Sequence, residues 1–136
     1  MKITCGTDII EIARVKESIE NVGTKFIERV YTEKEIEYCE SRKKQKYQHY
    51  AGRFAAKEAA FKAISKILDD KYSVCWKDFE TINDDQGRPS IILHNINTEK
   101  IESIDVSISH CKEYAIANVV ILFKWYKIWF FLKPDL

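Results

Sequence analysis

The fold of this chain is decided by the stretch Arg53-Phe-Ala-Ala-Lys-Glu-Ala-Ala-Phe-Lys-Ala63. It is rich in Ala, Lys and Glu and contains neither Gly nor Pro, which predicts a stable helix over about residues 48–67. At about 100° per residue, one broad face of this helix carries only small or aliphatic side chains: Ala56, Ala59, Ala60, Ala63, Ile67 and Leu68. Because small side chains allow close packing, we expect this helix to lie at the centre of the fold.

The sequence on either side predicts helices before this stretch and strands after it. Before it we expect a strand over 2–10, helices over 11–21 and 25–30, and a helix to about residue 42 that starts at the capping box Thr32-Glu-Lys-Glu35. After it we expect strands over 74–82, 89–94, 104–109 and 114–123, and a short helix over 98–101. This order favours an α+β fold in which an antiparallel sheet packs on the long central helix. Without a linker or repeat, residues 1–122 form one domain, and residues 123–136 form an aromatic C-terminal extension rather than a second domain.

Glu58 and Lys62 lie one turn apart on the side of the expected helix that faces away from the alanines. A carboxylate and an ammonium group on an anchored helix can act together on a phosphate, the carboxylate through a divalent cation and the lysine directly. The ordinary alternative is an exposed ion pair on a solvated helix, which contributes little. The pair alone therefore does not establish a function.

Three residues in other segments fit the same chemistry. Asp8 follows Gly6 at the end of the expected first strand, where a carboxylate can bind a cation or cap the next helix. His110 ends a later strand, where an imidazole can bind a phosphate, accept a proton or serve only the structure. Arg88 stands beside a rigid hairpin turn, Asp85-Gln-Gly-Arg-Pro89.

Together these segments resemble the holo-acyl-carrier-protein synthases of the 4'-phosphopantetheinyl transferase superfamily. The family pattern is G-x-D near the N-terminus, then an Arg, then R-F-A-x-K-E-A-x-x-K-A, G-[KR]-P and S-x-[ST]-H. This chain has the corresponding segments in the same order: Gly6-Thr-Asp8, Arg14, Arg53 to Ala63, Gly87-Arg-Pro89 and Ser107-Ile-Ser-His110. The resemblance covers residues 1–122 and favours the phosphate chemistry for Glu58 and Lys62 over the exposed ion pair.

The resemblance implies a transferase that moves 4'-phosphopantetheine from coenzyme A to a serine of apo acyl carrier protein, for fatty acid biosynthesis. It implies that Asp8 and Glu58 bind Mg²⁺, with Mn²⁺ as a substitute. Lys62 would stabilise the departing adenosine 3',5'-bisphosphate or the transferred phosphoryl oxygens. Both a metal-bound water and Glu58 remain candidates for the base that deprotonates the carrier serine.

The resemblance also implies how the substrates and the subunits meet. Arg53, His110 and Arg88 would bind the nucleotide end of coenzyme A, and Arg14 would dock the acidic carrier. A basic cluster precedes the central helix; its members are Arg42, Lys43, Lys44 and Lys46, followed by His49 and Arg53. It is either a solvated helix end or, as the resemblance implies, a surface that faces the phosphates of coenzyme A, through Lys44 and Lys46, or an acidic protein partner. The family is trimeric, so we expect a homotrimer in which His110 or this cluster approaches Asp8 and Glu58 of the next chain.

A noncatalytic protein that docks an acidic partner through Arg14 and the basic cluster is the alternative from another class. The intact residues Asp8, Glu58 and Lys62 argue against it, because docking alone has no use for a metal site. Composition also argues against a nucleic-acid binder, since the net charge is only +1. Four scattered cysteines and the lack of a secretory signal predict no disulfide framework and no zinc site, and they favour the cytoplasm.

The C-terminal segment from Phe123 to Leu136 departs from the family, whose members usually end near the last strand. It is aromatic and apolar but is interrupted by Lys124 and Lys127. It is too short for a transmembrane helix, which needs about 20 apolar residues. We expect it to cover part of its own subunit or of a neighbour.

Overall fold

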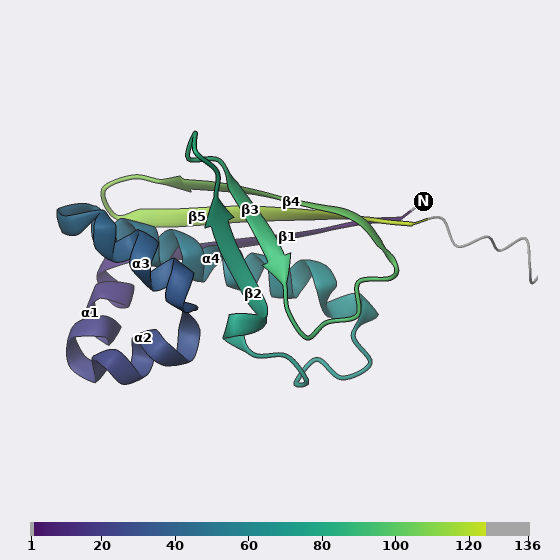
Figure 1. Cartoon of the computed structure of the whole chain (residues 1–136), viewed down its shortest axis with the longest axis horizontal. Coiled ribbons are helices and arrows are strands. Elements are labelled where there is room, and N and C mark those ends of the chain that lie inside the picture. The colour runs from purple at the N-terminus through teal and green to yellow at the C-terminus, as the bar shows by residue number, and fades with distance from the viewer. Residues whose placement is uncertain (1, 125–136) are drawn as a thin grey trace, which may run out of the picture.

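The computed structural model describes residues 2–124 and has the expected mixture of helices and antiparallel strands (Figure 1). The elements, in chain order, are β1 (Lys2–Glu11), α1 (Ile12–Val22), α2 (Thr24–Val30), α3 (Glu33–Ser41), η1 (Lys43–Gln45), α4 (Lys46–Ile64), η2 (Ser65–Ile67), η3 (Trp76–Asp78), β2 (Phe79–Asn83), β3 (Pro89–Leu93), β4 (Ile101–His110) and β5 (Tyr114–Phe123). The predicted α+β class is confirmed. The expected cover formed by the C-terminal extension lies outside the described residues from position 125 onward, whereas Phe123 is the last residue of β5 and is buried.

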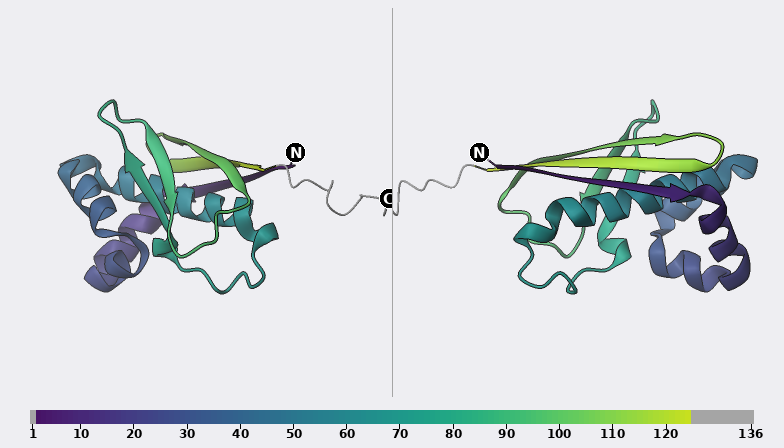
Figure 2. Two further views of the ribbon diagram at one scale, coloured as in Figure 1. Left: turned by 45° about the vertical axis from the view of Figure 1, so that its right-hand side comes forward. Right: turned by 180° about the vertical axis from the view of Figure 1, so that it is seen from behind.

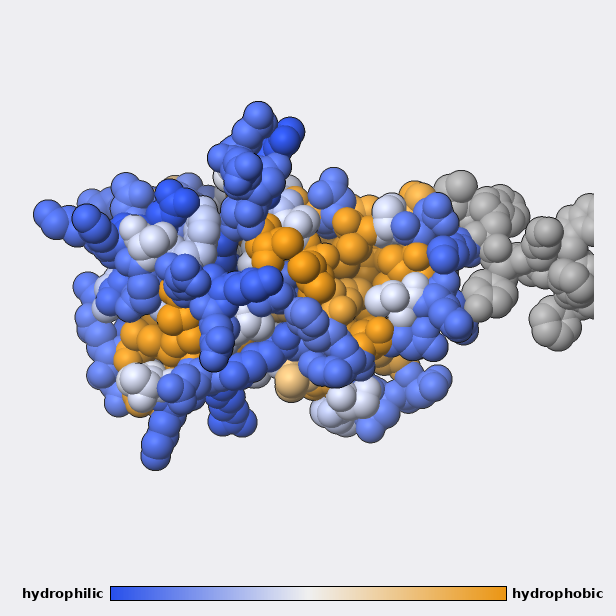
Figure 3. Space-filling view, in the orientation of Figure 1, coloured by the Kyte–Doolittle hydropathy of each residue, from blue (hydrophilic) through white to orange (hydrophobic). Residues whose placement is uncertain are grey.

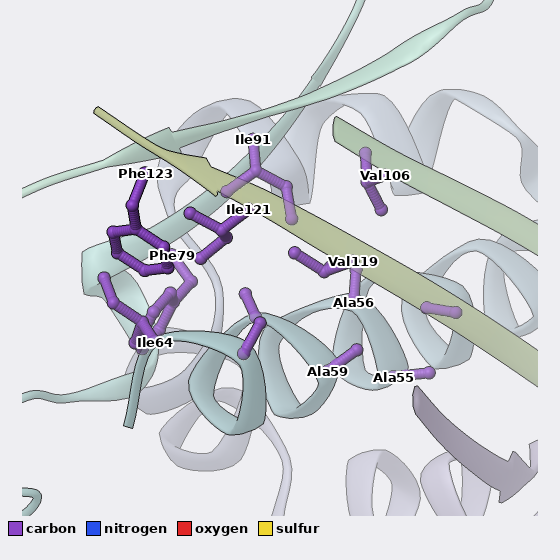
Figure 4. Close-up of a cluster of buried hydrophobic side chains, with 13 residues drawn as sticks. Ala55, Ala56, Ala59, Ile64, Phe79, Ile91, Val106, Val119, Ile121 and Phe123 are labelled. Atoms are coloured by element: carbon purple, nitrogen blue, oxygen red, sulfur yellow. The ribbon is translucent and has the colours of Figure 1, made fainter. Parts of the chain in front are cut away.

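The long helix α4 lies along one face of a three-stranded antiparallel sheet with the order β1-β5-β4, and α1–α3 gather at one end (Figures 1 and 2). A second sheet pairs β2 with β3 through the expected hairpin. The predicted alanine face of α4 is fully buried and packs against the inward side chains of β5, Ala117, Val119 and Ile121 (Figure 4). Burial of this apolar surface is the main stabilising contribution to the domain.

Gly6 explains how β1 comes so close to α4. A Cβ atom at this position would lie 1.9 Å from the backbone oxygen of Ala59, which is impossible without moving the strand or the helix. The hydroxyl of Thr4 donates a hydrogen bond of 2.6 Å to the carbonyl of Ala63, at the same contact. The absence of a side chain at Gly6 therefore allows the strand that carries Asp8 to lie directly on α4.

Two of the predicted elements differ from the structure. The expected helix over 98–101 is wrong: Asn97 accepts a hydrogen bond from the Glu99 backbone, and this turn leads straight into β4. The strand expected to begin at residue 74 begins only at Phe79, because η3 precedes it. The Asp78 carboxylate accepts a 2.8 Å hydrogen bond from the Cys75 backbone, which closes that turn.

Apolar side chains remain exposed on the sheet face that points away from α4. Ile3, Ile9 and Val120 are 64%, 61% and 45% exposed, and they alternate along β1 and β5 with residues that face the helix. Another apolar area lies over β3, where Ile92 is exposed (Figure 3). Solvent-exposed apolar residues grouped on one face indicate a surface suited to contact with another protein.

Candidate active site

Asp8 and Lys62 meet where β1 crosses α4. The Lys62 ammonium lies 3.3 Å from Asp8 Oδ1 and donates a 2.8 Å hydrogen bond to the carbonyl of Thr7. Asp8 is not a helix cap, because α1 begins at Ile12 with Glu11 at its N-cap position. The side chain of Asp8 is 19% exposed and that of Lys62 is 51% exposed, so both are accessible to a ligand.

Glu58, on α4, lies beside Asp8, on β1. We call these two residues the acidic pair. Burial raises the pKa of Glu58; the Asp8 carboxylate raises it further, while Lys62 lowers it. A carboxylate whose ionised form is disfavoured by a neighbouring carboxylate is stabilised by a cation between them. The acidic pair therefore fits a divalent cation with hard oxygen ligands, such as Mg²⁺.

The remaining coordination positions of such a cation are left to water and substrate. Within residues 2–124, no group of three or more His, Cys, Asp or Glu side chains is arranged to hold a metal ion. Mg²⁺ commonly uses one or two protein carboxylates together with water and phosphate oxygens. Arg14, on the first turns of α1, is exposed and lines a pocket of about 330 Å³ together with Asp8 and Glu58.

Four of the predicted residues gather beside the ring of Tyr38, which the sequence analysis did not single out. We call this group the Tyr38 cluster: Tyr38, Arg42, His49, Arg53 and His110. The guanidinium carbons of Arg53 and Arg42 lie 3.9 and 4.4 Å from the centre of the Tyr38 ring. His49 packs edge-on against Tyr38 at 5.5 Å and against His110 at 5.7 Å. Burial lowers the pKa of His49 to about 4, and the nearby Arg53, His110 and Arg42 contribute to that shift.

Arg53 is buried, so its side chain has little accessible surface for direct contact with coenzyme A. It is 3% exposed, one of its Nη atoms donates to Asn83 Oδ1, and its Nε is buried without a hydrogen-bond partner. His110, by contrast, is exposed at the end of β4. Within the described chain, no hydrogen bond, ion pair or ring contact joins the Tyr38 cluster to the acidic pair.

The other expected phosphate ligands are Lys44, Lys46 and Arg88. Lys44 is exposed on η1, whereas Lys46 forms a 3.5 Å ion pair with Glu40. Arg88 is exposed on the β2–β3 turn, and its Nε lies 2.8 Å from Asp84 Oδ2. Backbone and side-chain hydrogen bonds from Arg88 hold the pKa of Asp84 below its usual value. These residues are accessible, but the structure does not bring them together with Asp8 and Glu58.

Sequence reasoning missed one part of this region, a buried ion pair next to Glu58. The Lys57 ammonium lies 2.6 Å from Glu35 Oε1, and both side chains are almost completely buried. The available signals were Lys57 inside the motif helix and Glu35 in the capping box. Neither signal indicated that the two residues meet, because 22 residues separate them in the sequence.

Comparisons with known proteins show the family and the fold of this chain. The family model described as the 4'-phosphopantetheinyl transferase superfamily matches residues 4–119. The chain belongs to this superfamily. A holo-[acyl-carrier-protein] synthase of Ruminiclostridium cellulolyticum is 47% identical over 126 residues, which cover 89% of this chain and 92% of that protein. One of Solibacter usitatus is 40% identical, covering 89% of this chain and 98% of the relative.

Solved structures of superfamily members have the same fold. The holo-(acyl-carrier-protein) synthase of Bacillus anthracis, in complex with CoA (3',5'-ADP), has a TM-score of 0.72 and 37% identity, covering 87% of this chain and 94% of that one. The Helicobacter pylori enzyme in complex with coenzyme A has a TM-score of 0.75 and 32% identity, covering 87% and 99%. In the part of this transferase that the structure describes, no helix has the length and apolarity required to cross a membrane.

Proposed function

We propose that this chain is a holo-[acyl-carrier-protein] synthase. It transfers 4'-phosphopantetheine from coenzyme A to a serine of apo acyl carrier protein and releases adenosine 3',5'-bisphosphate. The observation that carries this proposal is the acidic pair beside Lys62, in a chain that is 47% identical to a protein of that name. We place the reaction in the cytoplasm and in fatty acid biosynthesis.

The reaction requires that negative charge on the pyrophosphate be compensated. The serine oxygen attacks the phosphorus next to the pantetheine arm, and the bond from that phosphorus to the oxygen of the leaving bisphosphate breaks. Asp8 and Glu58 would hold Mg²⁺, or Mn²⁺ in its place, which neutralises charge on the pyrophosphate. Lys62, 51% exposed, is free to turn from Asp8 toward the phosphoryl oxygens or the departing bisphosphate.

The nucleotide end of coenzyme A needs a basic surface that the acidic pair does not provide. The Tyr38 cluster offers the exposed Arg42 and His110, with the buried Arg53 behind them, and Lys44 and Arg88 add exposed positive charge elsewhere. Because the two groups of residues have no contact within one chain, we propose that one subunit supplies the acidic pair and a neighbour supplies the Tyr38 cluster. The exposed apolar residues Ile3, Ile9 and Val120 support a homotrimer packed through this sheet face.

The carrier protein would approach from the side of α1. Arg14 lies on the rim of the pocket that contains Asp8 and Glu58, so a carrier bound there would present its serine to the pyrophosphate. An exposed arginine is well suited to steer an acidic partner.

The decisive experiment is to weigh the carrier protein. Apo acyl carrier protein is incubated with the chain, coenzyme A and Mg²⁺, and its mass is measured. The proposal expects a gain equal to one 4'-phosphopantetheine group, dependent on both coenzyme A and the metal. Unchanged carrier mass with folded protein would contradict it, as would full activity in the presence of a chelator.

A further inference from the structure

Lys57 immediately precedes Glu58 on α4, but its side chain is only 1% exposed. Its ammonium nitrogen lies 2.6 Å from Glu35 Oε1, 2.6 Å from the carbonyl oxygen of Phe79 and 3.1 Å from that of Trp76. An ammonium group has three donors, so each donor has an acceptor. Burial lowers the pKa of Lys57, and the Glu35 carboxylate acts in the opposite direction. The ammonium group is therefore bound within the protein interior and is not available to a substrate.

Glu35 is equally constrained by its partners. Its Oε1 also accepts a 3.0 Å hydrogen bond from the Thr32 backbone, and its Oε2 accepts a 3.0 Å hydrogen bond from the Thr81 backbone. The ion pair of Lys57 and Glu35 thus joins α3, α4 and β2 at one buried point. A shift of α3 along α4 would leave a buried charge without its partner, which is costly. The ion pair therefore favours a single register of α3 on α4.

The ion pair belongs to two rows of side chains that face each other where α3 packs on α4. The row on α4 contains His49, Arg53 and Lys57, at intervals of four residues, and the row on α3 contains Glu35 and Tyr38, three residues apart. At one end of the rows Lys57 pairs with Glu35. Next along, the guanidinium carbon of Arg53 lies 3.9 Å from the centre of the Tyr38 ring, and His49 packs against the same ring at 5.5 Å. The Tyr38 cluster is therefore a continuation of the ion pair along the same contact between helices.

The exposed members of the Tyr38 cluster depend on this register. Arg42, at the end of α3, lies 4.4 Å from the centre of the Tyr38 ring, and His110 of β4 packs against His49 at 5.7 Å. The acidic pair depends on another contact, the one between β1 and α4. A change at the ion pair should therefore displace the Tyr38 cluster and leave the acidic pair in place.

We infer that Lys57 and Glu35 are positioning residues whose ion pair sets the register of α3 on α4, and so places the exposed side chains of the Tyr38 cluster for the nucleotide end of coenzyme A. The inference rests on the proposed function, in which that cluster binds the nucleotide. Lys57 and Glu58 are then neighbours in the sequence that serve different halves of the site, the Tyr38 cluster and the acidic pair.

The first test is the affinity for adenosine 3',5'-bisphosphate, measured by calorimetry in the presence of Mg²⁺. Lys57→Met/Glu35→Gln removes both charges at similar volume, and circular dichroism reports whether it is folded. This double variant should bind the bisphosphate about tenfold more weakly, because small displacements of binding groups cause losses of this size. The Mg²⁺ concentration for half-maximal activity at saturating coenzyme A should be unchanged. Wild-type affinity for the bisphosphate in the folded double variant would overturn the inference.

Two further variants control this measurement. Lys16→Met/Glu20→Gln makes the same substitutions at an exposed ion pair of α1, whose charged atoms lie 4.0 Å apart, and should leave the affinity unchanged. Glu35→Asp keeps the charge but shortens the side chain by a methylene group, so it should fold and bind the bisphosphate about two- to threefold more weakly. If the double variant does not fold, Glu35→Asp decides, and wild-type affinity in it would overturn the inference.

The second test asks which half of the site the ion pair serves. The folded double variant is mixed in equal amounts with Asp8→Asn or with His110→Ala, at a coenzyme A concentration well below KM. With Asp8→Asn, activity should rise to about a quarter of the wild-type value after subunit exchange, because one chain supplies an intact acidic pair and the other an intact Tyr38 cluster. With His110→Ala no gain is expected, since the cluster is impaired in both chains. A purely destabilising change would not distinguish the two partners. A gain with His110→Ala and none with Asp8→Asn would assign the ion pair to the acidic pair and overturn the inference.

Failure of the proposed function can be told apart from failure of this inference. If the wild-type chain does not modify the carrier, the proposed function fails, whereas the bisphosphate affinities still test the ion pair. If the wild-type chain modifies the carrier and the folded double variant binds the bisphosphate as tightly as the wild type, only the positioning role of Lys57 and Glu35 is refuted.

Discussion

The acidic pair and the Tyr38 cluster occupy different sides of α4 and have opposite charge. Arg53 lies five residues before Glu58, so the two side chains leave the helix about 140° apart. Asp8 and Glu58 carry negative charge that is only partly compensated by Lys62, whereas the cluster gathers arginine and histidine around Tyr38. Each side would suit one end of coenzyme A, and neither suits both. This difference is the basis of our proposal that a complete site uses two chains.

The substitution with the largest expected effect on the acidic pair is at Gly6, where β1 packs on α4. Gly6→Ala places a Cβ atom 1.9 Å from the Ala59 backbone oxygen, so β1 must move away from α4 and Asp8 moves with it. We expect a loss of about 3 kcal/mol in the free energy of unfolding and no measurable transfer. Urea unfolding measures the stability.

The matched control is Gly52→Ala, the same substitution at a glycine of α4 that faces Ile108. Its Cβ atom would lie 2.9 Å from Ile108 Cγ2, the end of a flexible side chain that can move. We therefore expect a loss below about 1 kcal/mol, with activity retained. Equal losses in the two variants would contradict the account of the β1–α4 contact.

Removing either member of the acidic pair should abolish turnover while leaving the fold intact. Asp8→Ala and Glu58→Ala should each lower kcat/KM by about 100-fold or more, because the cation loses one of its two carboxylates. The measurement is a titration of activity with Mg²⁺, accompanied by circular dichroism. If a variant keeps near-full activity at low Mg²⁺, the substituted residue does not bind the metal.

Charge reversal at Arg14 should affect one substrate and not the other. Arg14→Glu should raise the KM for the carrier about five- to tenfold and leave the KM for coenzyme A nearly unchanged. The effect should shrink as salt rises, because exposed charges are screened over about 8 Å at physiological ionic strength. Arg29→Glu makes the same change at an exposed position on α2 and should leave both constants unaltered. If Arg14→Glu raises the KM values for the carrier and for coenzyme A equally, Arg14 does not dock the carrier.

The smallest expected effect concerns stability and pH. Because the pKa of Glu58 is raised in the folded protein, its ionised form destabilises the fold at neutral pH, and Glu58→Gln removes that penalty. We expect the variant to melt about 1–2 °C higher at pH 7 and to be inactive. The difference in melting temperature should vanish below about pH 4.5, the ordinary pKa of a glutamate, because Glu58 is then protonated in both the folded and the unfolded protein. A variant that melts lower than the wild type at pH 7 would show that Glu58 stabilises the fold.

The sequence was sufficient for α4 and β1, where a local pattern determines the structure. The alanine spacing placed the buried face of α4, and the Gly-x-Asp motif placed Asp8 on a strand next to it. The sequence was insufficient where contacts between elements distant in the chain determine which side chains meet. The burial of Arg53 against Tyr38 depends on how α3 packs on α4, and the pairing of Lys57 with Glu35 depends on the same contact. Side chains that meet only through packing leave no periodic signal.

The claim that one chain supplies the acidic pair and another supplies the Tyr38 cluster is tested most directly by mixing two inactive variants. Asp8→Asn lacks the acidic pair and His110→Ala lacks an exposed part of the cluster, so each alone should be nearly inactive. After subunit exchange at equal amounts, a site at a subunit contact has one chance in four of receiving both intact halves, so about a quarter of the wild-type activity should return. If exchange is verified through a tag and the mixture is no more active than its components, the site is contained within one chain and the account is contradicted.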